Sequence, residues 1–140
     1  MHWAAQTGQV EAMKTLREVG SQISATTVDG ETPMHWAASQ GHVDVIKTLG
    51  DLGADPSLKT MKGWTTMHCA AQRGHINAIE VLGQMGVKIF AKDNLDRTAR
   101  HLAEYFGHSN AAKLLKKMEV QSVLLRWNHL MQVAEFAVSL

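Results

Sequence analysis

The sequence repeats itself with a period of 33 residues. The stretch MHWAA begins at Met1 and again at Met34, MHCAA begins at Met67, and a weaker copy, RHLAE, begins at Arg100. A fixed period between about 20 and 50 residues is typical of repeat proteins, in which each unit is too small to bury its own apolar face. The chain is therefore expected to fold as a stack of similar units, each packed against its neighbours.

One unit, residues 30–62, shows what each repeat is expected to contain. Thr32 and Pro33 are typical of a helix start, because a threonine hydroxyl caps the first turn and proline suits the first helical position. Gly41 is a suitable helix end. The apolar residues after it recur at helical spacing, which predicts a second, amphipathic helix. A turn-rich segment closes the unit, which is thus helix, turn, helix and hairpin-like loop.

Two glycines interrupt this pattern. Gly50 and Gly83 fall inside the predicted second helices, where each should cost about 1 kcal/mol relative to alanine. A close neighbour that needs the space is the one explanation that the sequence suggests.

The sequence of the unit resembles that of the ankyrin repeat, whose pattern is G-x-T-P-L-H-x-A-A-x-x-G-H, then an apolar helix, then G-A-D. Here the residues from Gly30 read GETPMHWAASQGH, and GAD follows at Gly53. The resemblance implies an all-α solenoid: a curved ankyrin-repeat array of helix-turn-helix-hairpin loop units, whose inner helices and loops form a concave binding surface. It covers a partial repeat, two full repeats and a divergent last repeat, at 1–29, 30–62, 63–95 and 96–118.

The last repeat carries polar residues at positions that stack in the others. Arg100 stands where Met34 and Met67 stand, and Ser109 stands where the earlier repeats have valine or isoleucine. Such substitutions fit a terminal capping repeat, which faces water on one side.

The composition excludes several classes of protein. With 14 basic and 13 acidic residues the formal net charge is +1, too small to suggest binding to nucleic acid or to an anionic membrane. No run of 18 apolar residues exists to span a membrane, and the single cysteine, Cys69, cannot form an internal disulfide. These features predict an intracellular protein, soluble or peripheral, in the cytoplasm or in an organelle such as a plastid. Met1 falls in mid-repeat, which suggests that further sequence precedes it.

The eight histidines recur largely at the repeat period, which argues against a metal site. Zinc ligands lie a few residues apart and converge on one point, whereas a 33-residue spacing distributes the imidazoles along the solenoid. No metal and no cofactor are therefore expected. The resemblance implies instead that threonine and histidine pairs hold the hairpin loops: Thr32 and His35, Thr65 and His68, Thr98 and His101.

No constellation of residues predicts an enzyme. Cys69 follows His68, but adjacent residues on a helix point about 100° apart, so they do not face each other as nucleophile and base. Cys69 also occupies the packing position of Trp36 and Leu102. The glycines are spread at the repeat period instead of forming a phosphate-binding loop.

The resemblance implies that contacts with a partner protein come from the loop tips and from the exposed ends of the first helices. Trp64, Tyr105 and Phe106 are the large aromatic residues there, and such side chains form binding hot spots. For Tyr105 and Phe106, covering the end of the array is an equal alternative. The residues expected to bind a partner are Glu31, Gln40, Met61, Lys62, Trp64, Gln72, Arg73, Arg97, Tyr105 and Phe106.

The repeat pattern ends after Lys117. The spacing of apolar residues in 119–140 predicts a C-terminal amphipathic helix with a broad apolar face. Three alternatives are open: the helix folds back over the end of the array, docks into a partner's groove, or lies on a membrane surface. Arg126 is the one Lys or Arg in this stretch, which disfavours the third alternative. The residues expected to dock are Leu124, Trp127, Leu130, Met131 and Phe136.

Together these features predict a non-catalytic scaffold for protein–protein interaction. The alternative is an accessory structural subunit that its C-terminal helix holds in a large complex. The segments PMHWAA and EAMKTL are similar to ankyrin arrays of unicellular algae, which makes a membrane-associated or photosynthetic organelle complex the assembly to consider.

Overall fold

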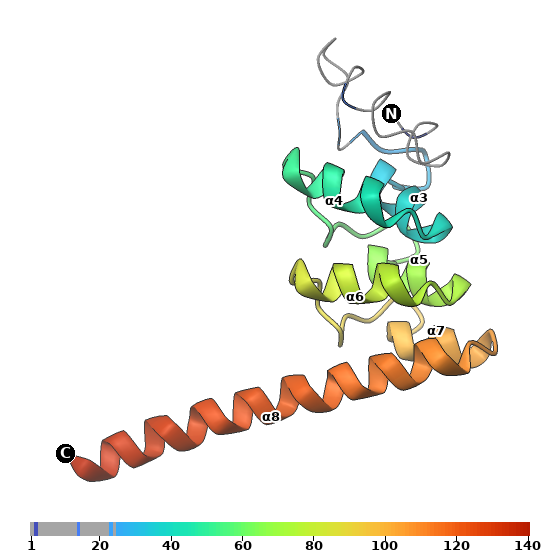
Figure 1. The fold of residues 1–140 in the computed structure, drawn as a ribbon. Coiled ribbons are helices and arrows are strands. Elements are labelled where there is room, and N and C mark those ends of the chain that lie inside the picture. The colour runs from blue at the N-terminus through green and yellow to red at the C-terminus, as the bar shows by residue number, and fades with distance from the viewer. Residues whose placement is uncertain (1, 3–13, 15–22, 24) are drawn as a thin grey trace.

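The computed structural model describes residues 2, 14, 23 and 25–140. The partial first repeat predicted at 1–29 therefore lies largely outside the described residues. Helix pairs make up the rest of the repeats and stack on one another (Figure 1). No strand occurs among residues 25–140, which confirms the prediction of an all-helical solenoid.

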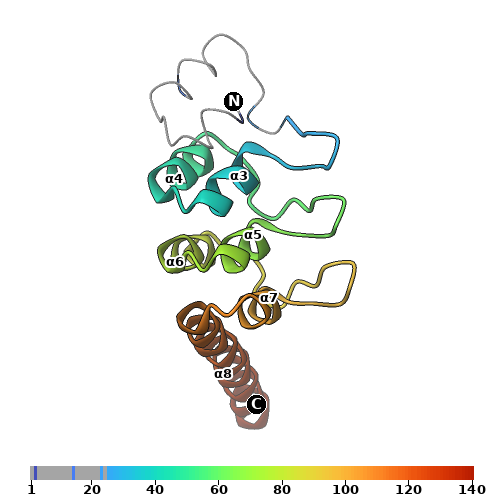
Figure 2. The ribbon, with the colours of Figure 1, turned by 90° about the vertical axis from the view of Figure 1, so that its right-hand side faces the viewer.

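The stack has an inner and an outer row of helices. Figure 2 shows it from the side, with hairpin loops that project beyond the inner row. The inner helices are α3 (Pro33–Gln40), α5 (Thr66–Arg73) and α7 (Ala99–Tyr105). The outer helices are α4 (Val43–Asp51), α6 (Ile76–Gln84) and the start of α8 (Ser109–Ser139).

The inner helices begin and end where the sequence predicts. The backbone of Thr32 is extended, its hydroxyl accepts a hydrogen bond from the backbone N–H of His35, and Pro33 occupies the first turn. Gly41 ends α3 in the left-handed region, at φ 71°, which glycine adopts without a steric penalty. Thr65 and Thr98 start α5 and α7 with the same capping box.

The core between the rows combines small and large residues. Ala37, Ala38, Ala70 and Ala71 of the inner helices are fully buried, so the backbones of neighbouring inner helices approach closely. Larger aliphatic residues of the outer helices fill the remaining space, and burial of each contributes about 1.5–3 kcal/mol relative to exposure. They are Ile46, Leu49, Ile79, Leu82 and Leu115.

Gly50 and Gly83, the two glycines inside the second helices, each leave space for a methionine of the next repeat. A Cβ atom added to Gly50 would lie 2.6 Å from the Cε atom of Met85. Gly83 faces the terminal methyl of Met118 in the same way. The loss of helix propensity at these glycines therefore accompanies close packing between the outer helices, and Gly50 and Met85 lie at equivalent positions to Gly83 and Met118.

The last helix, α8, is a single helix of 31 residues. Residues 109–118 complete the last repeat, where Ala111 and Leu115 are buried, and the helix then continues away from the stack (Figure 1). The sequence predicts a division at residue 118, but the helix runs through it without a break. Every residue from Val123 to Leu140 is exposed. Folding back over the array, the first alternative for this segment, is therefore not what the structure shows.

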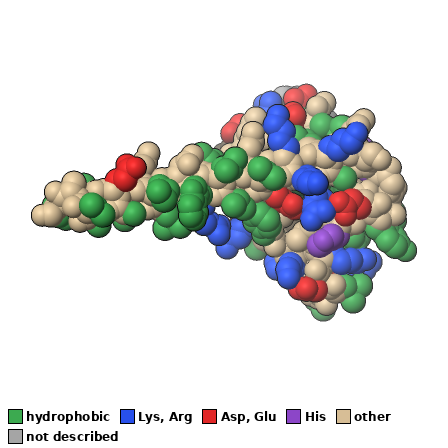
Figure 3. Space-filling view, turned by 90° about the horizontal axis from the view of Figure 1, so that it is seen from below, with side chains coloured by type: hydrophobic (Ala, Val, Ile, Leu, Met, Phe, Trp, Pro, Cys, Tyr) green, Lys and Arg blue, Asp and Glu red, His purple; other side chains and the backbone are tan. Residues whose placement is uncertain are grey.

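The end of the array is charged, in keeping with a capping repeat. The guanidinium group of Arg100 donates hydrogen bonds to Glu104 at 2.7 Å and to Glu119 of α8 at 2.9 Å. Figure 3 shows charged side chains gathered over this end and hydrophobic side chains along the projecting helix. None of the described helices combines the length and the apolar character that a membrane span requires.

Candidate protein-binding surface

The tips of the three hairpin loops, at residues 27–31, 60–64 and 93–97, lie in a row along the stack (Figure 2). Backbone hydrogen bonds join neighbouring tips: the N–H of Met61 donates to the carbonyl of Asp29 at 2.9 Å, and the N–H of Asn94 donates to that of Lys62 at 3.0 Å. The loops therefore form one connected edge.

One buried carboxylate organises the third tip. Asp93 accepts hydrogen bonds from the backbone N–H groups of Leu95 and Arg97, both at 2.9 Å, and from the indole N–H of Trp64 at 3.0 Å. It also pairs with the Arg97 guanidinium at 2.8 Å. Burial alone would raise the pKa of Asp93, but the hydrogen bonds from Arg97, Leu95 and Trp64 lower it to about 2.

Asp93 is not among the residues predicted from the sequence, although the repeat register carries a signal for it. Thr27 and Thr60 precede it by whole repeats, and each uses its hydroxyl to accept the backbone N–H four residues later, as Asp93 does. A side-chain acceptor at this position of every loop is what an alignment of the repeats could have revealed.

The side chain of Trp64 is less exposed than the sequence predicts. It is half-buried against the core, and its indole nitrogen is bonded to Asp93. The ammonium group of Lys62 lies 5.5 Å from the ring centroid, over the ring, within the range of a cation–π interaction. The side chain of Trp64 is thus held in place by Asp93 and Lys62 and is not freely exposed.

Two hollows lie between the tips, and they bring half of the predicted binding residues together. The larger, of about 370 Å³, lies between the second and third tips. The smaller, of about 110 Å³, lies between the first and second tips and includes Glu31. The larger is lined by Met61, Lys62, Trp64, Asn94, Leu95 and Arg97.

The other predicted residues lie at the far ends of the inner helices and line neither hollow. Tyr105 ends α7, and its ring meets that of Phe106 edge to face, with centroids 5.1 Å apart. An eight-residue helix is about 12 Å long, so the two groups of residues lie at opposite ends of the inner helices, about that far apart along them. Those at the far ends are Gln40, Gln72, Arg73, Tyr105 and Phe106.

The histidines connect each repeat to the loop of the next. The ring of His35 donates through Nε2 to the carbonyl oxygens of Leu58 at 2.9 Å and Trp64 at 3.1 Å, and that of His68 donates to Arg97 at 3.0 Å. Burial lowers the pKa of both histidines, so they are neutral near pH 7. Their Nδ1 atoms accept from the backbone N–H of Thr32 and Thr65, and the loops are thereby fixed to the helix starts.

The third threonine and histidine pair lies at the end of the array. The Nδ1 atom of His101 accepts from the backbone N–H of Thr98 at 3.0 Å. The residue 29 positions later, which would carry the accepting carbonyl in a further repeat, is Leu130 on the projecting helix. His101 is accordingly exposed, unlike His35 and His68.

Comparison with known families agrees with this geometry. A model described as "Ankyrin repeats (many copies)" matches residues 1–49, and one described as "Ankyrin repeats (3 copies)" matches residues 52–126. The chain belongs to the ankyrin-repeat family. Ankyrin repeats generally mediate protein–protein interactions, and the family is typically non-catalytic. A search of the curated proteins finds no significant match to this chain.

Two observations on the described residues concern the chemical reactivity of the ankyrin array. Cys69 is buried, and burial raises the pKa of its thiol to about 12, so the reactive thiolate is rare near pH 7. Over the described residues, no group of three or more His, Cys, Asp or Glu side chains is placed to hold a metal ion.

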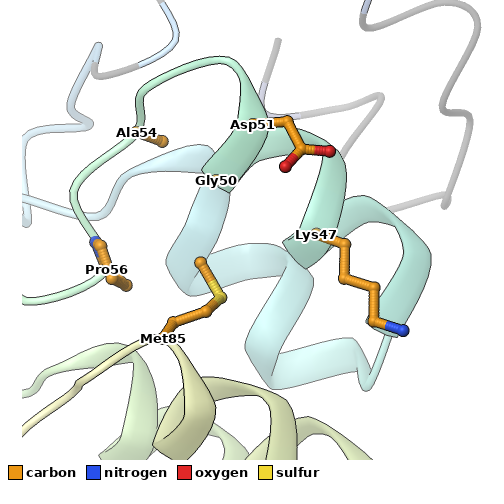
Figure 4. Close-up of a pocket in the computed structure, with 6 residues that line it drawn as sticks. All are labelled: Lys47, Gly50, Asp51, Ala54, Pro56 and Met85. Carbon is orange, nitrogen blue, oxygen red and sulfur yellow. The ribbon is translucent and has the colours of Figure 1, made fainter.

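A further hollow, of about 390 Å³, lies on the outer row of the ankyrin array. Figure 4 shows that Met85 reaches from the end of α6 toward Gly50, whereas Lys47 and Asp51 of α4 project away from it. This hollow surrounds the glycine–methionine contact between repeats, and its charged groups do not converge on a common point.

Proposed function

We propose that this ankyrin array is a non-catalytic module that binds a partner protein through its hairpin tips and its concave face. The hollow between the second and third tips carries the proposal. Met61 and Leu95 are large, exposed apolar side chains. Lys62 adds positive charge beside them, whereas the charge of Arg97 is balanced by Asp93. An apolar centre with a charged rim is the usual composition of a protein-binding surface.

The rigidity of the edge supports the same function. The hydrogen bonds between tips, the Asp93 network and the buried histidines order the loops in advance. Little conformational entropy is then lost when a partner binds, which is how pre-organised sites gain affinity. The charge of the rim favours a partner segment with an apolar side chain next to a carboxylate.

The test is binding by two double variants. Met61→Ser with Leu95→Ser alters the hollow at exposed positions, so the fold should be kept while capture of partners falls at least tenfold. Lys47→Ala with Asp51→Ala, on the outer row, is the matched control and should bind as wild type does. Equal capture by all three proteins, with partners compared by quantitative mass spectrometry, would contradict the proposal. A turnover that Cys69→Ala abolishes would contradict the non-catalytic part.

The second candidate is an accessory subunit that α8 holds in a larger assembly. Exposure of the predicted docking residues, Leu124, Trp127, Leu130, Met131 and Phe136, favours it. Such an assembly would be intracellular, in the cytoplasm or an organelle, because the single cysteine suits a reducing compartment. The repeat sequence is similar to those of algal ankyrin arrays, so a membrane-associated or photosynthetic complex is the first assembly to test. Co-purification that survives high salt would support this candidate over a transient adaptor.

A further inference from the structure

The projecting part of α8, residues 119–139, exposes a continuous apolar stripe. Successive residues of an α-helix lie about 100° apart around its axis, which places eight residues within about 60° of one line. All eight are apolar and exposed, and the exposed fraction of the seven larger ones runs from 45% for Met131 to 87% for Val138. The stripe consists of Val120, Val123, Leu124, Trp127, Leu130, Met131, Ala134 and Val138.

The stripe runs into a groove where α8 leaves the array. Phe90, from the segment between α6 and α7, faces Val120, Val123 and Leu124 across a hollow of about 320 Å³, with Glu119 at its edge. The apolar surface is therefore one feature that begins on the array and continues along the projecting helix.

A helix in this position needs a surface to pack against. Helical stability in proteins comes mainly from packing of the apolar face, and the described residues offer none to the helix beyond Leu124. We propose that the stripe binds the same stripe of a second copy of this chain, with the two helices antiparallel and centred on Leu130. This contact is independent of binding at the hairpin tips.

The distribution of side-chain sizes suits this pairing. In a two-fold antiparallel pair, each residue meets one that lies equally far beyond Leu130 on the same flank. Val123, seven residues before Leu130, then meets Ala137 of the second copy, seven residues after it. The bulky Trp127 lies between Met131 and Ala134 of the second copy, so the largest side chain of the stripe meets its smallest.

The array and the charges favour an antiparallel pair. A parallel pair would bring the second array against the first at Phe90, whereas an antiparallel pair brings only the far end of a helix to that groove. Beyond Glu119 the charged residues are Arg126 and Glu135 alone. Glu119 itself is paired with Arg100, so no cluster of like charges separates the two stripes.

The area available is in the range that a stable pair needs. Burial of one aliphatic side chain removes on the order of 100 Å² from water. The stripes and grooves of two copies together would remove on the order of 1,000–1,500 Å², against roughly 1,200–2,000 Å² for specific protein interfaces.

The molar mass of the full chain in solution tests the proposal. Light scattering coupled to size exclusion, over about 1–100 µM, should give twice the 15.4 kDa of one chain at the upper concentrations. A mass of one chain throughout that range would overturn the proposal and leave the stripe to another partner protein.

Two double variants then locate the contact. Trp127→Glu with Met131→Glu charges the stripe and should raise the dissociation constant of the dimer at least a hundredfold. Leu125→Glu with Val133→Glu adds the same charge off the stripe, at residues that are 70% and 53% exposed, and should keep the dimer. Thermal melting of the array checks that both remain folded. A dimer that survives the stripe variant, or fails only in the control, would overturn the proposal.

Cross-linking tests the orientation. Val123→Cys chains mixed with Ala137→Cys chains should oxidise mainly to the mixed disulfide, because these two positions meet in the antiparallel pair. Cys69 is buried and does not compete. Disulfides that form mainly between identical chains would overturn the antiparallel arrangement.

Discussion

The two parts of α8 belong to one helix and have opposite environments. In the array, Ala111 and Leu115 are 1% and 0% exposed, whereas on the projecting part Leu124 and Leu130 are 54% and 57% exposed. Both parts carry apolar residues at helical spacing. The difference shows that apolar residues at helical spacing predict a helix face that needs a packing partner. The repeat period identifies that partner only inside the array.

The largest expected effect is the difference in stability between two leucine variants, one in each part of α8. Leu115→Ala should lower the free energy of unfolding of the array by about 2–5 kcal/mol, because it leaves a cavity in the core. Leu125→Ala, at an exposed position off the stripe, should change it by less than about 0.5 kcal/mol. Urea unfolding followed by circular dichroism measures both. Similar losses in the two variants would show that the projecting part is packed against the array.

Acidification should weaken the array through its buried histidines. The pKa values of His35 and His68 are lowered in the folded chain, so below pH 6.5 the unfolded chain binds more protons than the folded chain. Stability should therefore be full above pH 6.5 and fall as the pH drops below it, by up to about 1.4 kcal/mol per pH unit for each histidine.

The exposed His129 of the projecting part serves as the control for this pH dependence. Unfolding measured from pH 7.5 to 5 should keep the wild-type slope in His129→Gln and lose part of it in His68→Gln. A slope that His68→Gln leaves unchanged would exclude the buried ring as its source.

The smallest effect lies where the two parts of α8 meet. Gly83→Ala improves helix propensity by about 1 kcal/mol, but the new methyl must displace Met118, so the single variant should be nearly neutral. In a Met118→Ala background the same change should stabilise the array by about 0.5–1 kcal/mol. A double-mutant cycle measures this coupling, and strictly additive effects would show that the glycine does not serve the methionine.

Much of the array could be predicted because its signals are local and periodic. The capping threonines, the helix-ending Gly41 and the histidine at the third position of each inner helix follow from residues a few positions apart. Their repetition at 33 residues also predicts the stack. The row of loop tips that includes Met61 and Arg97 follows from the same register.

What could not be predicted depends on contacts between repeats or beyond them. The contact between Gly50 and Met85 and the hydrogen bond that Trp64 donates to Asp93 each join residues about one repeat apart. The half-buried state of Trp64 follows from that bond. The direction of α8 after residue 118 depends on neighbours outside the periodic pattern, so the sequence left three alternatives open for it.

Amide hydrogen exchange along α8 of the full chain tests the central claim most directly. In dilute solution, residues 111–118 should exchange slowly and residues 123–139 orders of magnitude faster, because only the first part is packed in the array. At higher concentration the second part should gain protection as copies pair. Uniformly slow exchange along the whole helix at every concentration would contradict the account, since it would mean that the array itself covers the apolar stripe.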